Sequence, residues 1–201
     1  MTVAQALHWF DIPAFYQEAA RILKKNGTIA VFGYSMASVA PAGSYMDGGK
    51  APTEAAIALA NRASQLLLRI ASDSEISDHW DSRRALVDSH LVGHEPPAEL
   101  FANVVRRRST IEVEMTLRDL IGYIRSWSCY ATYCKLTGVA KYSEQDPVEK
   151  YQKEFIKIYS SSSSGSPSTT STVSNDDDVL ATTILVSYPV FLMLGTKRHE
   201  T

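Results

Sequence analysis

The sequence predicts an α/β fold whose sheet is doubly wound and contains parallel strands. A strand end, a helix and a buried strand follow one another over residues 1–34, which is the pattern of a βαβ unit. Helical and strand-like patterns then continue toward the C-terminus. The 201 residues, 45% of them apolar, suffice for one globular domain with a substantial core.

The opening segment carries the clearest local signals. Residues 1–6 have the composition of a strand end. Asp11 is expected to cap the helix that follows, and Asn26-Gly27 supplies a left-handed stop for that helix. Residues 28–34 are apolar without alternation, so we expect a central strand covered on both faces.

Ligands of such sheets bind beyond the carboxyl ends of the strands, which here are residues 5–10 and 34–38. Later periodicities predict helices over 53–71, 81–91, 116–138 and from 146, with a strand over 101–113. We expect the helices between residues 53 and 91 to be an insertion over the C-terminal strand ends.

The C-terminal part contains a tract rich in Ser and Thr, followed by a strand. We expect residues 160–178, rich in Ser and Thr, to be a disordered loop, because they bury too little apolar surface. Residues 179–201 are expected to close the sheet of the domain begun by residues 1–159, with Pro189 at an edge or bulge. The alternative for Val179–Gly195 is a membrane tail anchor.

Charge and cysteine content narrow the function classes. A net charge of −2 argues against a nucleic-acid surface, and we interpret Arg106–Arg108 as a solvated strand end instead of a phosphate site. Cys129 and Cys134 cannot form a disulfide framework or a metal site, so we expect no metal. With no signal peptide visible, the expected compartment is the cytoplasm.

Three segments resemble one family: Ala4-Gln-Ala-Leu-His-Trp-Phe-Asp11, Arg21-Ile-Leu-Lys-Lys-Asn-Gly27 and Ile29-Ala-Val-Phe-Gly-Tyr34. Together they resemble the A-x-H-W-F-D … R-x-L-K-x-G-G … Y pattern of type 11, trans-aconitate methyltransferase-like enzymes, which are class I S-adenosylmethionine-dependent methyltransferases. Residues 120–128 and 187–194 are similar to later elements of that group. The resemblance implies a Rossmann-like sheet and S-adenosylmethionine as cofactor.

The chain departs from that family in one respect. It has no D/E-x-G-x-G-x-G segment, the glycine-rich loop with which these enzymes bind the cofactor. We therefore expect an N-terminally truncated methyltransferase sheet that lacks its first three strands.

The resemblance and the strand-end position suggest four residues beside the cofactor: Gln5, Ala6, His8 and Trp9. The alternative for His8 and Trp9 is packing at a strand–helix turn. Asp11 is expected to be a helix cap and not a catalytic acid. No catalytic residue is assigned.

Tyr34, Arg125, Trp127 and Ser128 are the candidate residues for the methyl acceptor. An arginine fork binds a carboxylate through two hydrogen bonds. The alternative for Arg125 is a helix surface with the arginine in solvent. A further candidate set is Trp80, Arg83 and Arg84.

The function predicted from these residues is S-adenosylmethionine-dependent methylation of a small molecule, with a carboxylate as the expected acceptor. A non-catalytic remnant or interaction protein is the alternative, which would associate through an exposed sheet edge. A tail-anchored membrane protein is the third reading.

Overall fold

The computed structural model describes residues 1–41, 51–161 and 175–198. Its elements follow one another in this order: β1 (Thr2–Ala4), the 3-10 helix η1 (Leu7–Trp9), α1 (Ile12–Ile22), β2 (Thr28–Tyr34), β3 (Ser38–Ala40), α2 (Glu54–Ser72), α3 (Ser74–Ser77), α4 (Arg84–Asp88), β4 (Phe101–Thr116), α5 (Leu117–Arg125), α6 (Ser128–Thr137), α7 (Pro147–Ser160), α8 (Asp176–Leu180) and β5 (Thr183–Lys197).

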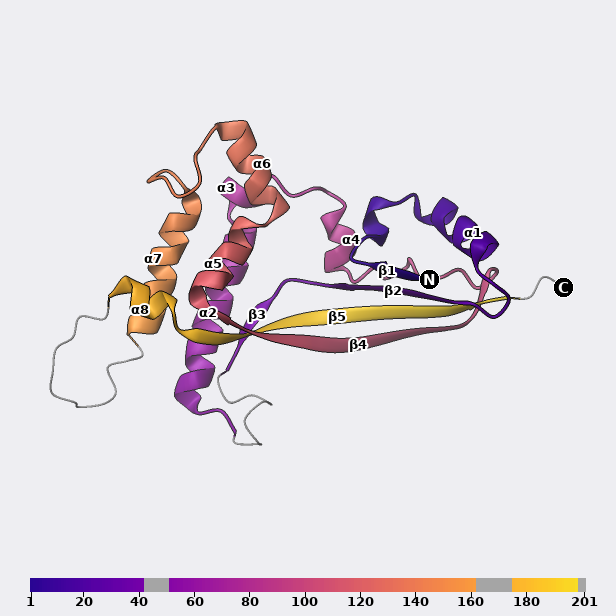
Figure 1. The fold of residues 1–201 in the computed structure, drawn as a ribbon, viewed down its shortest axis with the longest axis horizontal. Helices are drawn as coiled ribbons and strands as arrows, with labels where there is room; N and C mark the ends of the chain where they lie inside the picture. Colours follow the sequence, from indigo (N-terminus) through magenta and orange to yellow (C-terminus); the bar gives the residue numbers. More distant parts are fainter. Residues whose placement is uncertain (42–50, 162–174, 199–201) are drawn as a thin grey trace. The chain divides into compact units, whose positions relative to one another are not determined.

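The strands form one mixed sheet (Figure 1). It has five strands in the order β1-β2-β5-β3, and β4 pairs with β5 off this path. β1 and β2 are parallel, as the βαβ pattern predicts, with Val3 opposite Val31. β5 is antiparallel to both β2 and β3.

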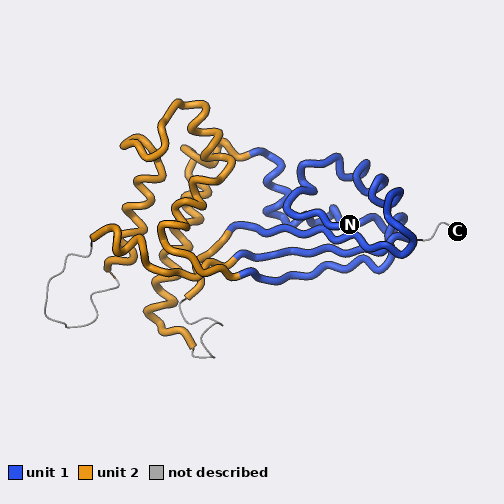
Figure 2. Tube along the Cα trace, viewed as in Figure 1, with its two compact units in different colours: residues 1–36, 81–111, 188–201 blue, residues 37–80, 112–187 orange. Residues whose placement is uncertain are grey.

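The chain divides into two units, each made of several stretches of sequence (Figure 2). The first unit contains residues 1–36, 81–111 and 188–201, and the second contains 37–80 and 112–187. β4 and β5 contribute residues to both.

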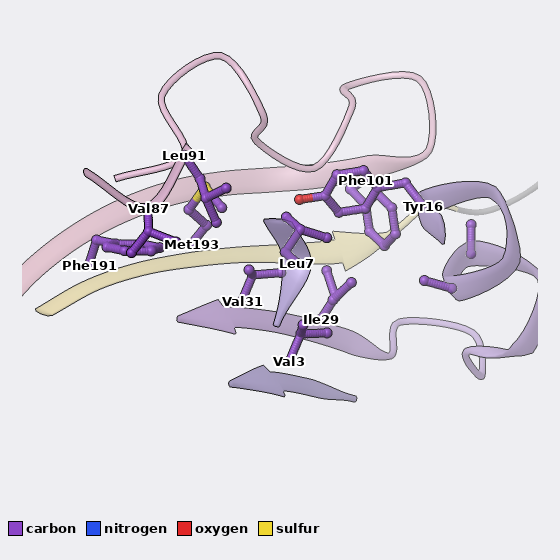
Figure 3. Packing of buried hydrophobic residues seen from close by; sticks show 12 residues of the cluster. Val3, Leu7, Tyr16, Ile29, Val31, Val87, Leu91, Phe101, Phe191 and Met193 are labelled. Atoms are coloured by element: carbon purple, nitrogen blue, oxygen red, sulfur yellow. The ribbon is translucent and has the colours of Figure 1, made fainter. Parts of the chain in front are cut away.

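The core of the first unit lies between α1 and one face of the sheet (Figure 3). Asp11 caps α1 as predicted, accepting a hydrogen bond from the Ala14 N–H at 3.1 Å. The left-handed residue after the helix is Asn26, with φ 59°. The buried apolar residues are Val3, Leu7, Tyr16, Ala19, Ala20, Ile29, Val31, Val87, Leu91, Phe101, Phe191 and Met193.

The prediction that β2 is covered on both faces is wrong for the described residues. Ile29 and Val31 are buried, whereas Phe32 is 36% and Tyr34 38% exposed. Successive side chains of a strand point to opposite faces, and only one face of β2 meets the core.

The second unit is built around α2, whose buried residues include Ala63, Leu67 and Ile70 as its periodicity predicts. The single helix predicted over 116–138 is two helices, α5 and α6. Trp127 is extended (φ −63°, ψ 139°) between them. Its buried indole packs against Trp80 and Tyr123, so these tertiary contacts interrupt the helix.

β5 confirms a strand, and not a helical tail anchor, over most of Val179–Gly195. Within the described residues, no helix is both long and apolar enough to cross a bilayer. Residues 160 and 161 continue or close α7, and 176–178 are helical in α8, so the edges of the predicted 160–178 loop are wrong. Residues 162–174 of that loop lie outside the described residues.

Pro189 does not lie on an edge strand, because β5 pairs with other strands along both of its sides. Its carbonyl accepts a hydrogen bond from the Ser35 N–H at 3.0 Å. Since the N–H and C=O of one strand residue point the same way, the missing proline N–H faces residues 35–37, between β2 and β3. The proline therefore sits where the strand changes partner.

Candidate functional site

Gln5 connects the end of β1 to the end of β2. Its backbone N–H donates to the Phe32 carbonyl at 2.8 Å. Its side-chain Nε2 donates to the Tyr34 carbonyl at 3.1 Å, and its Oε1 accepts from the Tyr34 N–H at 2.8 Å. The amide thus extends the β1–β2 ladder by one step and holds the two predicted ligand segments together.

Gly33 allows this connection to form. A Cβ at that position would lie 2.5 Å from Gln5 Oε1 and 2.7 Å from Phe191 Cζ, closer than any side chain tolerates. A glycine inside a strand is a recognised signal of close approach. Gly33 is visible in the sequence, but the sequence does not show that the Gln5 amide and the Phe191 ring are the groups that approach it.

His8 is buried in the turn after β1, with 8% of its surface exposed. Burial lowers the pKa of its imidazole, and the positive charge of Arg83 lowers it further. His8 is therefore neutral at pH 7, and its ring lies 4.7 Å from the Trp9 ring. Ala6 begins the same turn, accepting a hydrogen bond from the Trp9 N–H at 3.0 Å.

Trp9 presents its indole to solvent, with 48% of its surface exposed. The Arg83 guanidinium carbon lies 4.7 Å from the centre of the Trp9 ring. Arg83 in turn donates from Nε and Nη2 to the two carboxylate oxygens of Asp81, at 3.1 and 3.3 Å. Trp9 and Arg83, which belong to separate candidate sets in the sequence, are thus in contact in the structure.

Tyr34 belongs to the same unit. Its ring meets that of Tyr188 edge-on, with 5.4 Å between centroids. The Gln5 amide fixes the Tyr34 backbone, so the position of this side chain depends on the turn that carries His8 and Trp9.

Arg125 lies in the second unit and is not in solvent, so that alternative is wrong: it is 8% exposed. Its Nη2 donates to Glu149 at 2.6 Å and its Nε to Asp146 at 3.4 Å. The guanidinium also covers the Tyr142 ring at 4.3 Å. Two carboxylates of the chain already occupy this fork.

Trp127 and Ser128 belong to the second unit as well. Trp127 is buried, and Ser128 is exposed at the start of α6. A role for Arg125, Trp127 and Ser128 in acceptor binding stays a prediction.

A pocket of about 560 Å³ lies in the first unit at the N-terminal end of α1. None of the predicted site residues lines it. Its walls are Asp11, Ile12, Pro13, Tyr16, Gln17, Gly93, His94, Glu95 and Pro97. Within the described ranges, no group of three or more His, Cys, Asp or Glu side chains could hold a metal ion.

No protein-family model matches the chain. The chain is 25% identical over 198 residues to a protein of Dictyostelium discoideum described as a candidate methyltransferase. The alignment covers 98% of this chain and 59% of that relative, so the chain spans about three fifths of its length.

One solved structure shares the fold of this chain. The structure of a candidate type II methyltransferase from Anaeromyxobacter dehalogenans superposes with a TM-score of 0.58 at 19% identity, covering 97% of this chain and 63% of that one. A candidate methyltransferase from Bacillus halodurans, 15% identical over 98% of this chain and 68% of that one, reaches a TM-score of 0.31, too low to argue from. The chain therefore has the mixed α/β, Rossmann-like fold that it shares with the A. dehalogenans structure.

Proposed function

We propose that this chain is part of an S-adenosylmethionine-dependent methyltransferase whose acceptor is a small molecule with a carboxylate. The observation that carries the proposal is the turn after β1. A neutral His8 and a half-exposed Trp9 lie beyond the carboxyl end of a parallel strand, where ligands of such sheets bind. The D. discoideum relative supports the methyltransferase part of the proposal.

The residues present fit one side of this cofactor. S-adenosylmethionine supplies an activated methyl group when it is bound. Trp9 offers an aromatic face to a flat ring such as adenine, whereas the Gln5 amide is already committed to Tyr34. The sequence contains no glycine-rich loop for the rest of the ligand. We therefore expect this chain to form one wall of the cofactor site.

The remaining residues orient the acceptor relative to the methyl group of the cofactor. An acceptor carboxylate is ionised at neutral pH and needs no general base. A neutral His8 suits such a site because it adds no charge that would need pairing. Gln5 and Gly33 fix the turn on which His8 and Trp9 stand.

The isolated chain is expected to release no measurable heat with S-adenosylmethionine in titration calorimetry, because the glycine-rich loop is missing from it. Micromolar binding by the chain alone would contradict this account of the loop.

The positive test adds the region of a relative that this chain does not cover. The chain is co-expressed with the part of the D. discoideum relative that it does not match, and binding of S-adenosylmethionine and methyl transfer to small carboxylates are measured. Trp9→Ala should weaken cofactor binding about fivefold to tenfold through the lost ring contact. Phe10→Ala, at the neighbouring exposed aromatic, is the matched control. A folded complex that binds no S-adenosylmethionine would refute the proposal.

The alternative is a non-catalytic interaction protein. β1 lies at one end of the strand order and pairs only with β2 among the described residues. Phe32 and Tyr34 are exposed on the adjacent strand. An open edge of this kind favours association with another chain. A genomic sequence upstream of Met1 that encodes no glycine-rich loop would favour this reading.

A further inference from the structure

We propose that Arg83, lying over Trp9, binds a carboxylate group of the acceptor. The inference rests on the proposed function and adds to it the residue that recognises the substrate's charge. It differs from the first sequence-based assignment, to Arg125, and selects Arg83 from the further candidate set of Trp80, Arg83 and Arg84.

The position of Arg83 supports this role. Arg83 packs on the Trp9 ring, in the turn that follows the carboxyl end of β1. All the side chains involved, including His8 and Asp81, belong to the first unit. A ligand held by Arg83 would therefore lie next to the residues expected to contact the cofactor.

One edge of the Arg83 guanidinium is open to a ligand. Arg83 has five N–H donors arranged as two bidentate edges. Asp81 takes the Nε/Nη2 edge, and within the described residues Nη1 donates to no acceptor. The Nη1/Nη2 edge remains available, and the side chain is 51% exposed.

The Arg83 guanidinium is also preorganised for binding. Asp81 and the Trp9 ring hold the guanidinium in one orientation before any ligand arrives. Less conformational entropy is then lost when a carboxylate binds. An arginine stacked on an aromatic ring and free along one edge is suited to a planar carboxylate.

Two other arginines of the described residues, each bound to a carboxylate of the chain, are less suitable. Arg125 is buried between Asp146 and Glu149. Arg106 is bound to Glu95 and to the carbonyls of His90 and Leu91. Arg83 is the one of these three that combines exposure with an unoccupied edge and a candidate site residue beneath it.

The test is a titration of the full chain with succinate, followed by the Trp9 indole N–H signal in ¹H–¹⁵N NMR spectra. The signal is assigned by its loss in Trp9→Phe. We expect a saturable shift with succinate and none with succinamide, which has the same shape without the charge. Inorganic phosphate separates recognition of a planar carboxylate from general anion binding, and it should shift the signal less.

Variants locate the binding site. Arg83→Lys keeps the charge but loses the bidentate edge, so its affinity for succinate should fall about tenfold. Arg21→Lys is the matched control, since Arg21 also pairs with a carboxylate through Nε and Nη2, that of Glu18, and the substitution should leave the affinity unchanged. Thermal melting checks that each variant is folded.

Several results would overturn the inference: no shift with succinate in the native chain, equal affinity in Arg83→Lys, or equal shifts with succinamide or phosphate. The titration contains no S-adenosylmethionine. Succinate binding by the chain, combined with a folded co-expressed complex that binds no S-adenosylmethionine, would therefore refute the proposed function and leave the Arg83 site standing.

Discussion

The turn after β1 depends on the absence of a Cβ atom at position 33. The Gln5 amide reaches the Tyr34 backbone only because position 33 has no side chain. The clash of a Cβ there involves a hydrogen-bonded amide and a buried Phe191 ring, neither of which can move without losing its own contacts.

Gly33→Ala should therefore lower the free energy of unfolding by about 1–3 kcal/mol, the usual cost of overpacking. Urea unfolding followed by circular dichroism measures it. Gly122→Ala is the control: it lies within α5, a Cβ there meets nothing within 4 Å, and it should stabilise the chain by about 0.5–1 kcal/mol. Equal effects from the two substitutions would contradict the close-packing account.

Asp146 is the most connected buried carboxylate described. Its Oδ2 accepts from the Tyr130 hydroxyl at 3.0 Å, the Tyr142 N–H at 2.9 Å and Arg125 Nε at 3.4 Å. Its Oδ1 caps α7 through the Val148 N–H at 2.9 Å. The Asp146 side chain thus caps the start of α7 and pairs with the buried positive charge of Arg125.

Asp146→Ala should cost about 3–5 kcal/mol, because it leaves the buried Arg125 charge with Glu149 alone. The unfolding free energy in urea is the measurement. Arg118→Ala, which breaks the exposed pair with Asp177, should cost no more than about 1 kcal/mol. A cost for Asp146→Ala as small as that of Arg118→Ala would show that the network adds little.

At the scale of helices and strands, the sequence predicts what local chemistry determines. The caps Asp11, Thr116 and Asp146 identify three helix starts correctly, because each side chain bonds to an N–H two or three residues away. The break at Trp127 was not predictable, since it depends on contact with Trp80. A local pattern carries no record of such distant partners.

The same limit applies to the sheet and the site. The apolar run of β2 suggested burial on both faces, but a sequence does not show how many layers cover a strand. Pro189 suggested an edge or a bulge; the strand is not at an edge, and three residues, 35–37, lie opposite the two residues 188–189 where β5 changes partner from β2 to β3. Trp9 and Arg83, or Arg125 and Asp146, meet only after folding, so their pairing could not be derived from spacing.

At the scale of the whole molecule, each unit carries a carboxylate whose pKa is held below its ordinary value. In the second unit, hydrogen bonds from the Tyr151 hydroxyl and the Glu75 N–H lower the pKa of Asp73. In the first unit, burial acts to raise the pKa of Glu95, but the hydrogen bond from Arg106, hydrogen bonds from the backbone and the positive charge of Arg106 together outweigh burial, so the net shift is downward.

These shifts predict acid sensitivity of the entire chain. A carboxyl group whose pKa is lower in the folded state binds fewer protons there than in the unfolded state. Its stabilisation is complete above the ordinary pKa, about 4, and is lost as the pH falls toward the folded value. The carboxylate contribution to the unfolding free energy should therefore be nearly constant from pH 7 to 5 and fall below pH 4, whereas the lowered pKa of His8 makes the total begin to decline as the pH falls through about 6.5. Tyr151→Phe removes the main cause of the Asp73 shift, so its stability relative to native should improve as the pH falls from 5 to 3. A native chain equally stable at pH 3 and pH 7, or a Tyr151→Phe deficit that stays constant across this range, would contradict the assignment of these carboxylates as the acid-sensitive groups.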